Sequence, residues 1–541
     1  MNGKVTSISG ATVCVDLPDL KIGERVFVGS NSLTGEVVRL DGNIATVQVF
    51  EENRGLGIGE PVTSAKGPLT VCLGPGLLGG IFDGLQRPLP LLQENSGDFI
   101  TSGQSPFPLD CSRSWDFSSE RKAGDELRLG ETFGKVREGH IDHLLLSPKA
   151  GRLGQLNNGV LQLDSPAAIL DDNEPLHGWH NWPVRNARPF RQKLPPTTPL
   201  VTGQRCLDFL FPLLKGGVAI VPGGFGTGKT ILEQTIAKFA DVDVVVYVGC
   251  GERGNEMAGL LDEFGELEDP RSKRPLMERT IIVANTSNMP VAARESSIFT
   301  AVTMAEYYRD MGLDVLFLAD SLSRWAEALR EISAALEEMP GEDGYPTYLG
   351  SRLSGFIERA GVVETLSGGK GSLSMILAVS PPGADFAEPV TQACLRVAGA
   401  LYMLDTQLAH RRHFPAINWT QSFSLYSDTA MAHFSEQHSE WAKHQARCRD
   451  ILQREESLRE VAEVVGMEGL QDGDRLLMLT AEKIRLDFLC QNSFTEDAYA
   501  APQSTIGHIA SLVAEHDRLA AALNDGALLD DLLKEAADAS L

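Results

Sequence analysis

From residue 200 onward, nearly continuous apolar segments alternate with amphipathic ones. The apolar segments are of the kind expected for strands covered on both faces, and they lie at 217–222, 242–250, 280–284, 313–319, 372–379 and 400–404. Between them, the spacing of apolar positions predicts helices at 231–239, 298–311 and 322–338. Strands that alternate with helices predict a parallel α/β sheet, with ligands at the carboxyl ends of its strands.

The pattern differs on both sides of this α/β domain, which we place at 184–428. Residues 1–67 hold short β-branched segments between Gly and Asp turns and predict an N-terminal β-barrel. Residues 68–110 are rich in Gly and Pro and are interpreted as a linker, whereas 111–183 return to a β pattern that predicts a β-rich, bulge-like insertion. Amphipathic segments predict a C-terminal helical domain over 429–541, with helices at 435–465, 472–491, 503–524 and 527–537.

Composition narrows the class of protein. A chain of 541 residues is long enough for several domains, and a formal net charge of −25 argues against nucleic-acid binding, which needs a basic surface. No apolar segment is long enough to insert into a membrane, and the first ten residues lack the apolar core of a secretion signal. The 8 cysteines are scattered without a C-x-x-C pair, so we expect a reducing, cytoplasmic location without disulfides.

One stretch carries a complete phosphate-binding motif, Gly223-Gly224-Phe225-Gly226-Thr227-Gly228-Lys229-Thr230, which continues into Ile231. It follows a predicted strand and opens a predicted helix, which is the context that G-x-x-x-x-G-K-[ST] requires. Backbone N–H groups of such a loop surround phosphate oxygens, and the helix N-terminus adds its positive dipole end. We expect Lys229 to reach the β- and γ-phosphates and Thr230 to bind Mg²⁺.

Two acidic residues follow predicted strands. Glu252 lies in a turn with Gly on both sides of the Glu252-Arg253 pair, and a carboxylate there is suited to orient a water against a γ-phosphate. Arg253 is expected to pair with Glu252 or with phosphate oxygens, although a surface turn would explain both residues. Asp320 ends an apolar strand in the Walker B manner and is predicted to hold Mg²⁺; the alternative is a helix cap.

Other polar and aromatic residues give weaker signals. Phe414 and Phe494 could clamp a base, but on residue type alone both would be core residues. His177 and His180 have a spacing that a metal site could use, yet no third ligand recurs nearby, so packing histidines are the default interpretation.

Several longer stretches then identify a family, and they lie at 182–185 (WPVR), 202–205 (TGQR), 248–257 (VGCGERGNEM), 284–295, 323–332, 337–346, 380–392 and 411–419. With these stretches and the phosphate-binding loop, the sequence resembles the catalytic A subunit of V/A-type rotary ATPases, and most closely the archaeal and bacterial members.

The resemblance implies a three-domain subunit with a bulge-like insertion, alternating with B subunits in an A3B3 ring around a central stalk. Central and peripheral stalks would connect the ring to a membrane sector that moves H⁺ or Na⁺ while the ring hydrolyses or synthesises ATP. The resemblance also implies that Glu252 orients the attacking water, that Arg253 contacts phosphate, and that Phe414 and Phe494 stack on adenine. The arginine finger is expected from a neighbouring B subunit.

The sequence departs from the family at three positions. Gly224 replaces a usual Pro or Ala and is expected to loosen the loop, Thr227 excludes the redox chemistry of relatives with Cys there, and Leu322 replaces a usual Thr. The chain also looks short for the family towards its C-terminus.

Two other classes stay open at this stage, a homohexameric P-loop motor of the secretion or Rho-like kind and a non-catalytic nucleotide-binding subunit.

Overall fold

The computed structural model describes residues 3–97 and 99–539, with side chains up to residue 534. The chain forms two compact units and passes between them several times. The first unit comprises Met1–Pro196, Lys215–Ile220 and Val242–Ala398, and the second comprises Thr197–Leu214, Val221–Asp241 and Gly399–Leu541.

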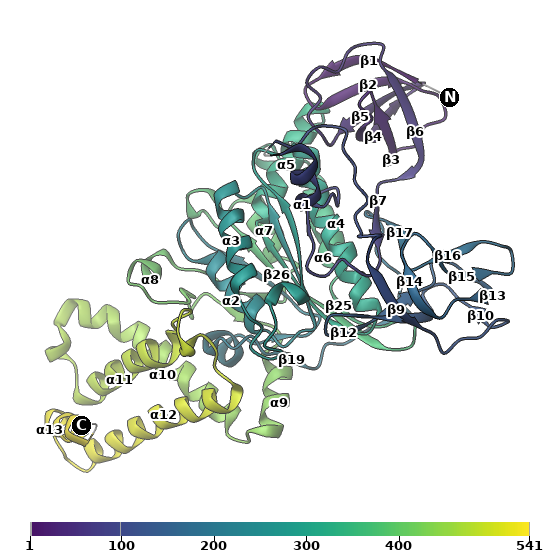
Figure 1. Ribbon diagram of the computed structural model, residues 1–541. Helices are drawn as coiled ribbons and strands as arrows, with labels where there is room; N and C mark the ends of the chain where they lie inside the picture. The colour runs from purple at the N-terminus through teal and green to yellow at the C-terminus, as the bar shows by residue number, and fades with distance from the viewer. Residues whose placement is uncertain (1–2, 98, 540–541) are drawn as a thin grey trace. The chain divides into compact units, whose positions relative to one another are not determined.

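In the first unit, six strands near the N-terminus form a closed barrel (Figure 1). The order around the barrel is β1 (Gly3–Ser9), β2 (Thr12–Asp16), β5 (Ile44–Val49), β4 (Leu33–Asp41), β3 (Glu24–Val28) and β6 (Pro61–Pro68). Valine side chains point inward from most of these strands and form a separate small core. The predicted N-terminal barrel is therefore confirmed.

The β-rich segment that follows contains two four-stranded antiparallel sheets. One has the order β10 (Glu126–Leu127), β13 (Gly151–Leu156), β15 (Pro166–Leu170), β16 (Pro175–His177), and the other β12 (Ile141–Leu146), β11 (Thr132–Glu138), β9 (Ser114–Ser118), β14 (Gly159–Gln162). The chain leaves this segment through β17 (His180–Pro183), which pairs with β7 (Thr70–Leu73). His180 is buried and its Nε2 lies 3.1 Å from Arg188 Nη1, a packing role that agrees with the default interpretation.

A parallel sheet organises the rest of this unit, as the apolar segments predict. Its adjacent strands are β8 (Ile81–Phe82), β23 (Thr280–Asn285), β22 (Val244–Cys250), β24 (Asp314–Asp320) and β26 (Lys370–Val379). β21 (Val218–Pro222) starts beside β26, where Gly217 O accepts a hydrogen bond from Met375 N at 3.0 Å. An antiparallel strand, β25 (Gly361–Glu364), pairs with β26 and with β18 (Gln192–Leu194).

The helices of this unit are α1 (Leu89–Ser96), α3 (Gly254–Glu266), α4 (Val291–Asp310), α5 (Leu322–Ala335), α6 (Leu349–Ile357) and α7 (Pro389–Leu395). The predicted helix at 322–338 corresponds to α5, whereas α4 begins seven positions before the predicted 298. The sequence analysis did not predict α3, α6 and α7, although the buried apolar residues of α3 and α6 recur at helical spacing.

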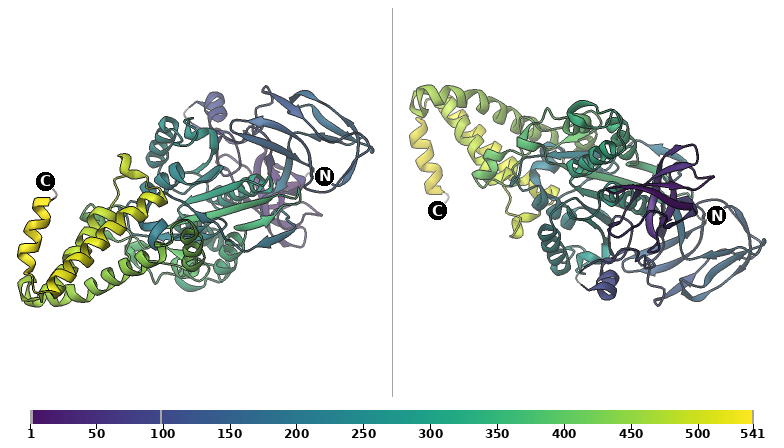
Figure 2. Two further views of the ribbon diagram at one scale, coloured as in Figure 1. Left: turned by 90° about the horizontal axis from the view of Figure 1, so that it is seen from below. Right: turned by 90° about the horizontal axis from the view of Figure 1, so that it is seen from above.

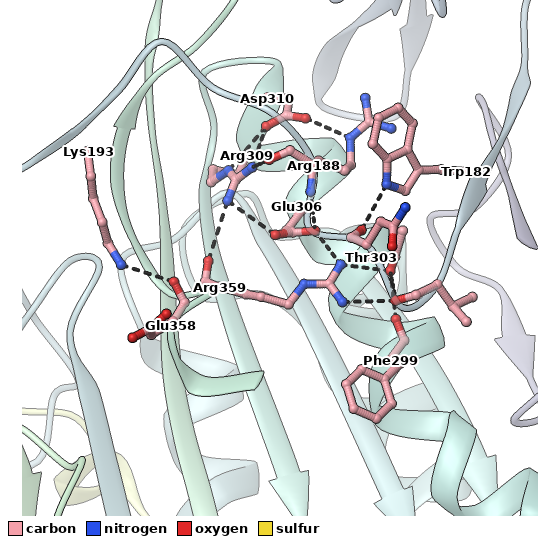
Figure 3. A network of polar contacts seen from close by, with 12 residues as sticks. Trp182, Arg188, Lys193, Phe299, Thr303, Glu306, Arg309, Asp310, Glu358 and Arg359 are labelled. Atoms are coloured by element: carbon pink, nitrogen blue, oxygen red, sulfur yellow. Dashed lines mark hydrogen bonds and ion pairs between the residues drawn. The ribbon is translucent and has the colours of Figure 1, made fainter. Parts of the chain in front are cut away.

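Charged residues are buried along α4, and Figure 3 shows how they are balanced. Glu306 accepts a hydrogen bond from Arg188 N at 3.1 Å, forms an ion pair with Arg359, and lies 3.5 Å from Arg309 Nη1. Asp310 pairs with Arg188 Nε at 2.6 Å and with Arg309 Nη2 at 2.8 Å. Two carboxylates thus serve three guanidinium groups, that of Arg309 in α4 itself and those of Arg188 and Arg359 from other parts of the chain.

In the second unit, helices predominate. They are α2 (Lys229–Phe239), α8 (Thr406–His410), α9 (Ser427–Gln437), α10 (Trp441–Val465), α11 (Asp472–Lys483), α12 (Pro502–Asn524) and α13 (Leu529–Ala539). Short strand pairs, β19 (Pro199–Leu200) with β20 (Leu213–Leu214) and β27 (Ala400–Leu401) with β28 (Phe423–Ser424), complete it. α10, α11 and α12 pack against one another and lie side by side in Figure 2.

The single helix predicted at 435–465 is wrong, because the structure divides it into α9 and α10. The chain turns at His438, whose φ of −136° and ψ of 85° are not helical. This turn stacks the rings of Phe434 and Trp441 at 4.5 Å between centroids, and Trp441 also packs edge-on against Phe209. None of the helices found among the described residues has the length and apolar character needed to cross a membrane.

We expect Glu306→Ala to destabilise the first unit by about 3–5 kcal/mol, because it leaves the buried guanidinium groups of Arg309 and Arg359 short of a counter-charge. Urea denaturation of the full chain, followed by tryptophan fluorescence, measures the effect. Glu331→Ala, at an exposed position of α5, is the matched control and should leave the transition unchanged. Equal stability of the two variants would contradict the balance of charge described for α4.

Candidate active site

The phosphate-binding motif forms a loop between β21 and α2 in the second unit. Gly228 has a φ of 85°, in the left-handed region that favours glycine, and a Cβ there would lie 3.3 Å from Phe414 Cε1. A Cβ on Gly223 would lie 2.7 Å from Thr227 Oγ1 and 2.8 Å from Leu404 Cβ. Both glycines therefore allow the loop to pass close to its neighbours.

Side chains of the motif bond to the loop's own backbone. Lys229 Nζ donates to Gly223 O at 2.7 Å and to Gly224 O at 2.9 Å, and Thr227 Oγ1 donates to Gly224 O at 2.8 Å. The carbonyl group of Gly224 is thus held by two donors. Phe225 is 84% exposed and Ile231 38% exposed.

The two aromatic residues predicted to contact a base differ in environment. Phe414 is half-buried, its ring lies against Gly228, and its carbonyl oxygen accepts a hydrogen bond from Gln491 N at 2.6 Å. Phe494 is 82% exposed, in a turn where its N–H donates to Asn492 Oδ1 at 3.0 Å. The structure thus joins Phe414 to the phosphate-binding loop.

Glu252, Arg253 and Asp320 belong to the first unit, at the carboxyl edge of its sheet. β22 and β24 are parallel neighbours with Gly249 opposite Asp320, so the turn that follows β22 emerges beside this acid. Asp320 is buried, and Glu252 is half-buried, with its backbone oxygen accepting from Ser287 N at 2.9 Å. The register of two strands therefore brings both predicted acids to one edge.

A glycine shapes the turn before Glu252. Gly251 has a φ of 74°, and a Cβ there would lie 2.7 Å from Arg324 Cβ and 3.0 Å from Arg294 Cδ. Arg294 Nη2 in turn donates to Ser287 O at 2.9 Å. Two arginines on different helices thus enclose the turn.

The pKa of Glu252 is raised to about 7. Burial is the main cause, followed by repulsion from the charge of Asp320 and by the charge and hydrogen bond of Glu256, while the Arg324 guanidinium opposes the rise. A carboxyl group with such a pKa changes protonation near neutral pH, which suits a group that handles a proton of water.

Arg324 is a site residue that sequence reasoning missed. It lies in the first turn of α5, four residues after Asp320, and its Nη1 pairs with Glu327 at 2.9 Å. Its pKa is raised, chiefly by that hydrogen bond, and the charges of Glu252 and Glu256 contribute. The only signal in the sequence was an arginine one helical turn beyond a Walker B acid. Arg253 extends into solvent, 3.9 Å from Glu256 Oε1.

The donors present suit Mg²⁺. The carboxylate of Asp320 and the hydroxyl group of Thr230 are hard oxygen donors of the kind that Mg²⁺ prefers. The repulsion that Asp320 exerts on Glu252 indicates an excess of negative charge at the edge of the sheet, which a divalent cation would offset.

Four family models match this chain, and together they cover most of its length. Models of the ATP synthase alpha/beta family match its nucleotide-binding domain to 203–424, its β-barrel domain to 5–65 and its barrel-sandwich domain to 107–185. The model of the C-terminal domain of V and A type ATP synthase matches residues 432–529.

Relatives are similar over nearly the whole chain. The V-type ATP synthase alpha chain of Anaeromyxobacter sp. (strain K) is 50% identical over 98% of this chain and 93% of its own length. The corresponding A subunit of the A-type ATP synthase of Halobacterium salinarum (strain ATCC 29341 / DSM 671 / R1) is 47% identical over 98% of this chain and 92% of its own. The chain belongs to the family of V/A-type ATP synthase A subunits, which are also named alpha chains.

A solved structure is similar in fold alone. The assembled ATPase EscN from the type III secretion system of enteropathogenic E. coli superposes with a TM-score of 0.67, at 22% identity, over 94% of this chain and 100% of that one.

We expect the pKa of Glu252 to respond in opposite directions to two neighbours. In nucleotide-free and Mg²⁺-free buffer, Asp320→Asn removes the like charge and should lower this pKa by roughly one pH unit, whereas Arg324→Gln removes the cation and should raise it. The measurement is the ¹³C shift of the glutamate carboxyl carbons against pH, assigned with Glu252→Gln. Asp262→Asn, at an exposed position of α3, is the control. A Glu252 pKa that stays the same in both variants would contradict this electrostatic account.

Proposed function

We propose that this chain is the catalytic subunit of a rotary V/A-type ATPase/ATP synthase that hydrolyses or synthesises MgATP at an interface with a B subunit. The observation that carries the proposal is the pairing, within one chain of this family, of a complete phosphate-binding loop with Glu252, a carboxyl group whose pKa is raised to about 7 beside Asp320. A family member that only bound nucleotide would not need the second feature.

On this proposal, the second unit binds the nucleotide. The backbone from Gly223 to Gly228 and the ammonium group of Lys229 surround the phosphates, and Phe414 and Phe494 contact the base. The ammonium group of Lys229 is already held at the loop by neutral carbonyl oxygens. When a nucleotide binds, this ammonium group would exchange these acceptors for the charged oxygens of a phosphate. Thr230 and Asp320 would hold Mg²⁺, which offsets the charge of the phosphates.

The first unit supplies the groups that act on water. Glu252 orients the attacking water as a carboxylate, and Arg324 favours this charged form because its guanidinium lowers the pKa of Glu252 against burial and Asp320. Arg253 is exposed next to Glu256, so its side chain can turn toward a phosphate group. A further cation, the arginine finger, would come from a neighbouring B subunit.

As for partners, the relatives are ATP synthase subunits, so the chain works in a multisubunit complex. We propose that it alternates with B subunits in an A3B3 ring, joined by central and peripheral stalks to a membrane sector that moves H⁺ or Na⁺. The chain would then lie on the cytoplasmic side, peripheral to the membrane.

The other classes are less well supported. The secretion ATPase is similar at 22% identity, far below the 50% of the V-type relative, so it supports the fold alone. A Rho-like motor would need a basic surface for RNA, in contrast to a net charge of −25. A non-catalytic subunit would have no need of Lys229, Thr230 and Glu252 together.

The test is MgATPase activity of the purified A–B ring. Glu252→Gln should keep nucleotide binding and lose roughly 10²–10⁴-fold in turnover, because the amide cannot accept a proton, whereas Lys229→Ala should also weaken binding. Glu266→Gln, at an exposed position near the end of α3, is the matched control.

Unchanged turnover of Glu252→Gln would remove that residue from the mechanism. Gel filtration of the chain by itself, without B subunits, provides a separate check, because a fully active homohexamer would favour the secretion or Rho-like class.

A further inference from the structure

The segment Thr202-Gly203-Gln204-Arg205 has no role in the catalytic account, yet it is one of the most highly bonded parts of the second unit. Its partners lie almost 300 positions later, in residues 488–500, the stretch that also contains Phe494. Gln204 Nε2 donates to Ala498 O at 2.8 Å, and Gly203 O accepts from Ala500 N at 2.9 Å. The segment therefore fixes the course of this later stretch.

Arg205 makes the most extensive contacts. It is only 6% exposed, and its guanidinium donates to Phe488 O at 2.5 Å and to Cys490 O at 2.8 Å. It also forms a two-point contact with Asp497, at 2.6 and 3.2 Å. A planar guanidinium can serve these acceptors together, which the single ammonium of a lysine cannot do.

Gln491 continues the network toward Phe414. Its side chain is 1% exposed, accepts from Arg205 N at 2.5 Å, and donates to Gly203 O at 3.1 Å and Asp497 O at 2.9 Å. Its backbone N–H donates to Phe414 O at 2.6 Å. One buried glutamine thus connects the 202–205 segment with the residue that packs against the phosphate-binding loop.

Asp497 continues the network toward Phe494. Its Oδ2 accepts from Asn492 N at 3.2 Å, and Asn492 Oδ1 accepts from Phe494 N at 3.0 Å. The turn that presents the exposed Phe494 ring is therefore built on the carboxylate that Arg205 holds.

Close packing fixes the same segment to the helix that follows the phosphate-binding loop. Gly203 has a φ of 77°, and a Cβ there would lie 2.3 Å from Tyr499 Cδ2. The Tyr499 ring lies 5.5 Å from that of Phe239, the last residue of α2. The 202–205 segment is therefore fixed in position relative to α2 as well as to Phe414 and Phe494.

We infer that Arg205 and Gln491 are positioning residues for the base of the nucleotide, and that they set its affinity through Phe414 and Phe494. The inference rests on the proposed base-contacting role of these two aromatic residues. Arg205 and Gln491 are buried and fully engaged with protein acceptors, so they act through the aromatic residues and not on the ligand. Their loss should weaken binding of the base and leave binding of the phosphates nearly unchanged.

The experiment compares MgATP with magnesium tripolyphosphate, which has the phosphates without a base, by titration calorimetry on the full chain. Arg205→Lys and Gln491→Glu should raise the Kd for ATP roughly tenfold, the scale of one lost aromatic–base stack, and the Kd for tripolyphosphate less than about twofold. Arg475→Lys is the matched control, because Arg475 also bridges two acids, Asp472 and Asp530, within the second unit.

The outcomes separate this inference from the function on which it rests. Equal losses for ATP and tripolyphosphate, or an unchanged Kd for ATP, would overturn the positioning role. Phe414→Ala and Phe494→Ala are the reference: if they weaken ATP binding while Arg205→Lys and Gln491→Glu do not, the inference fails and the base-contacting role stands. If neither aromatic variant affects ATP binding, the base-contacting role itself is wrong, and the inference falls with it.

Discussion

The parallel pairing of β22 and β24 brings the carboxyl groups of Glu252 and Asp320 to one edge of a buried sheet, where burial and the charge of Asp320 raise the pKa of Glu252. Two parallel strands, β22 and β24, are paired so that Asp320 stands opposite Gly249, and the chain then needs only three residues to reach Glu252. Asp320 is the last residue of β24 and is held by the pairing of this buried sheet, whereas Glu252 follows the end of β22 by two residues. The repulsion, added to burial, keeps the pKa of Glu252 near neutral pH, where a carboxyl group can exchange a proton with water.

The rest of the first unit holds this edge in place. α4 is buried along nearly its whole length, and its charged residues are satisfied by arginines from other parts of the chain. The stability of such a helix comes little from its own sequence pattern and mainly from its packing and ion pairs with the surrounding chain. Its N-terminal part also supplies Arg294, which encloses the turn before Glu252 together with Arg324. The packing of the first unit and the shape of the turn before Glu252 are therefore coupled through one helix.

In the second unit, the parts proposed to bind nucleotide are held in place in two different ways. The phosphate-binding loop depends on local features, glycines and bonds within the loop, whereas the aromatic residues depend on a buried polar network from distant positions. Affinity for phosphates and affinity for the base would thus have separate structural origins in one unit.

The sequence by itself determined the barrel, the parallel sheet, the phosphate-binding loop and the two acids at strand ends, because each depends on local periodicity or on a short motif. It also indicated the family, which the relatives confirm. It could not identify Arg324, the division between α9 and α10, or the network of Arg205, Gln491 and Asp497. The network joins positions far apart in the chain, and the other two features depend on which residues surround Arg324 and the turn at His438. Only the tertiary structure decides which buried charges and polar groups meet, because burial and hydrogen bonding depend on neighbours in space.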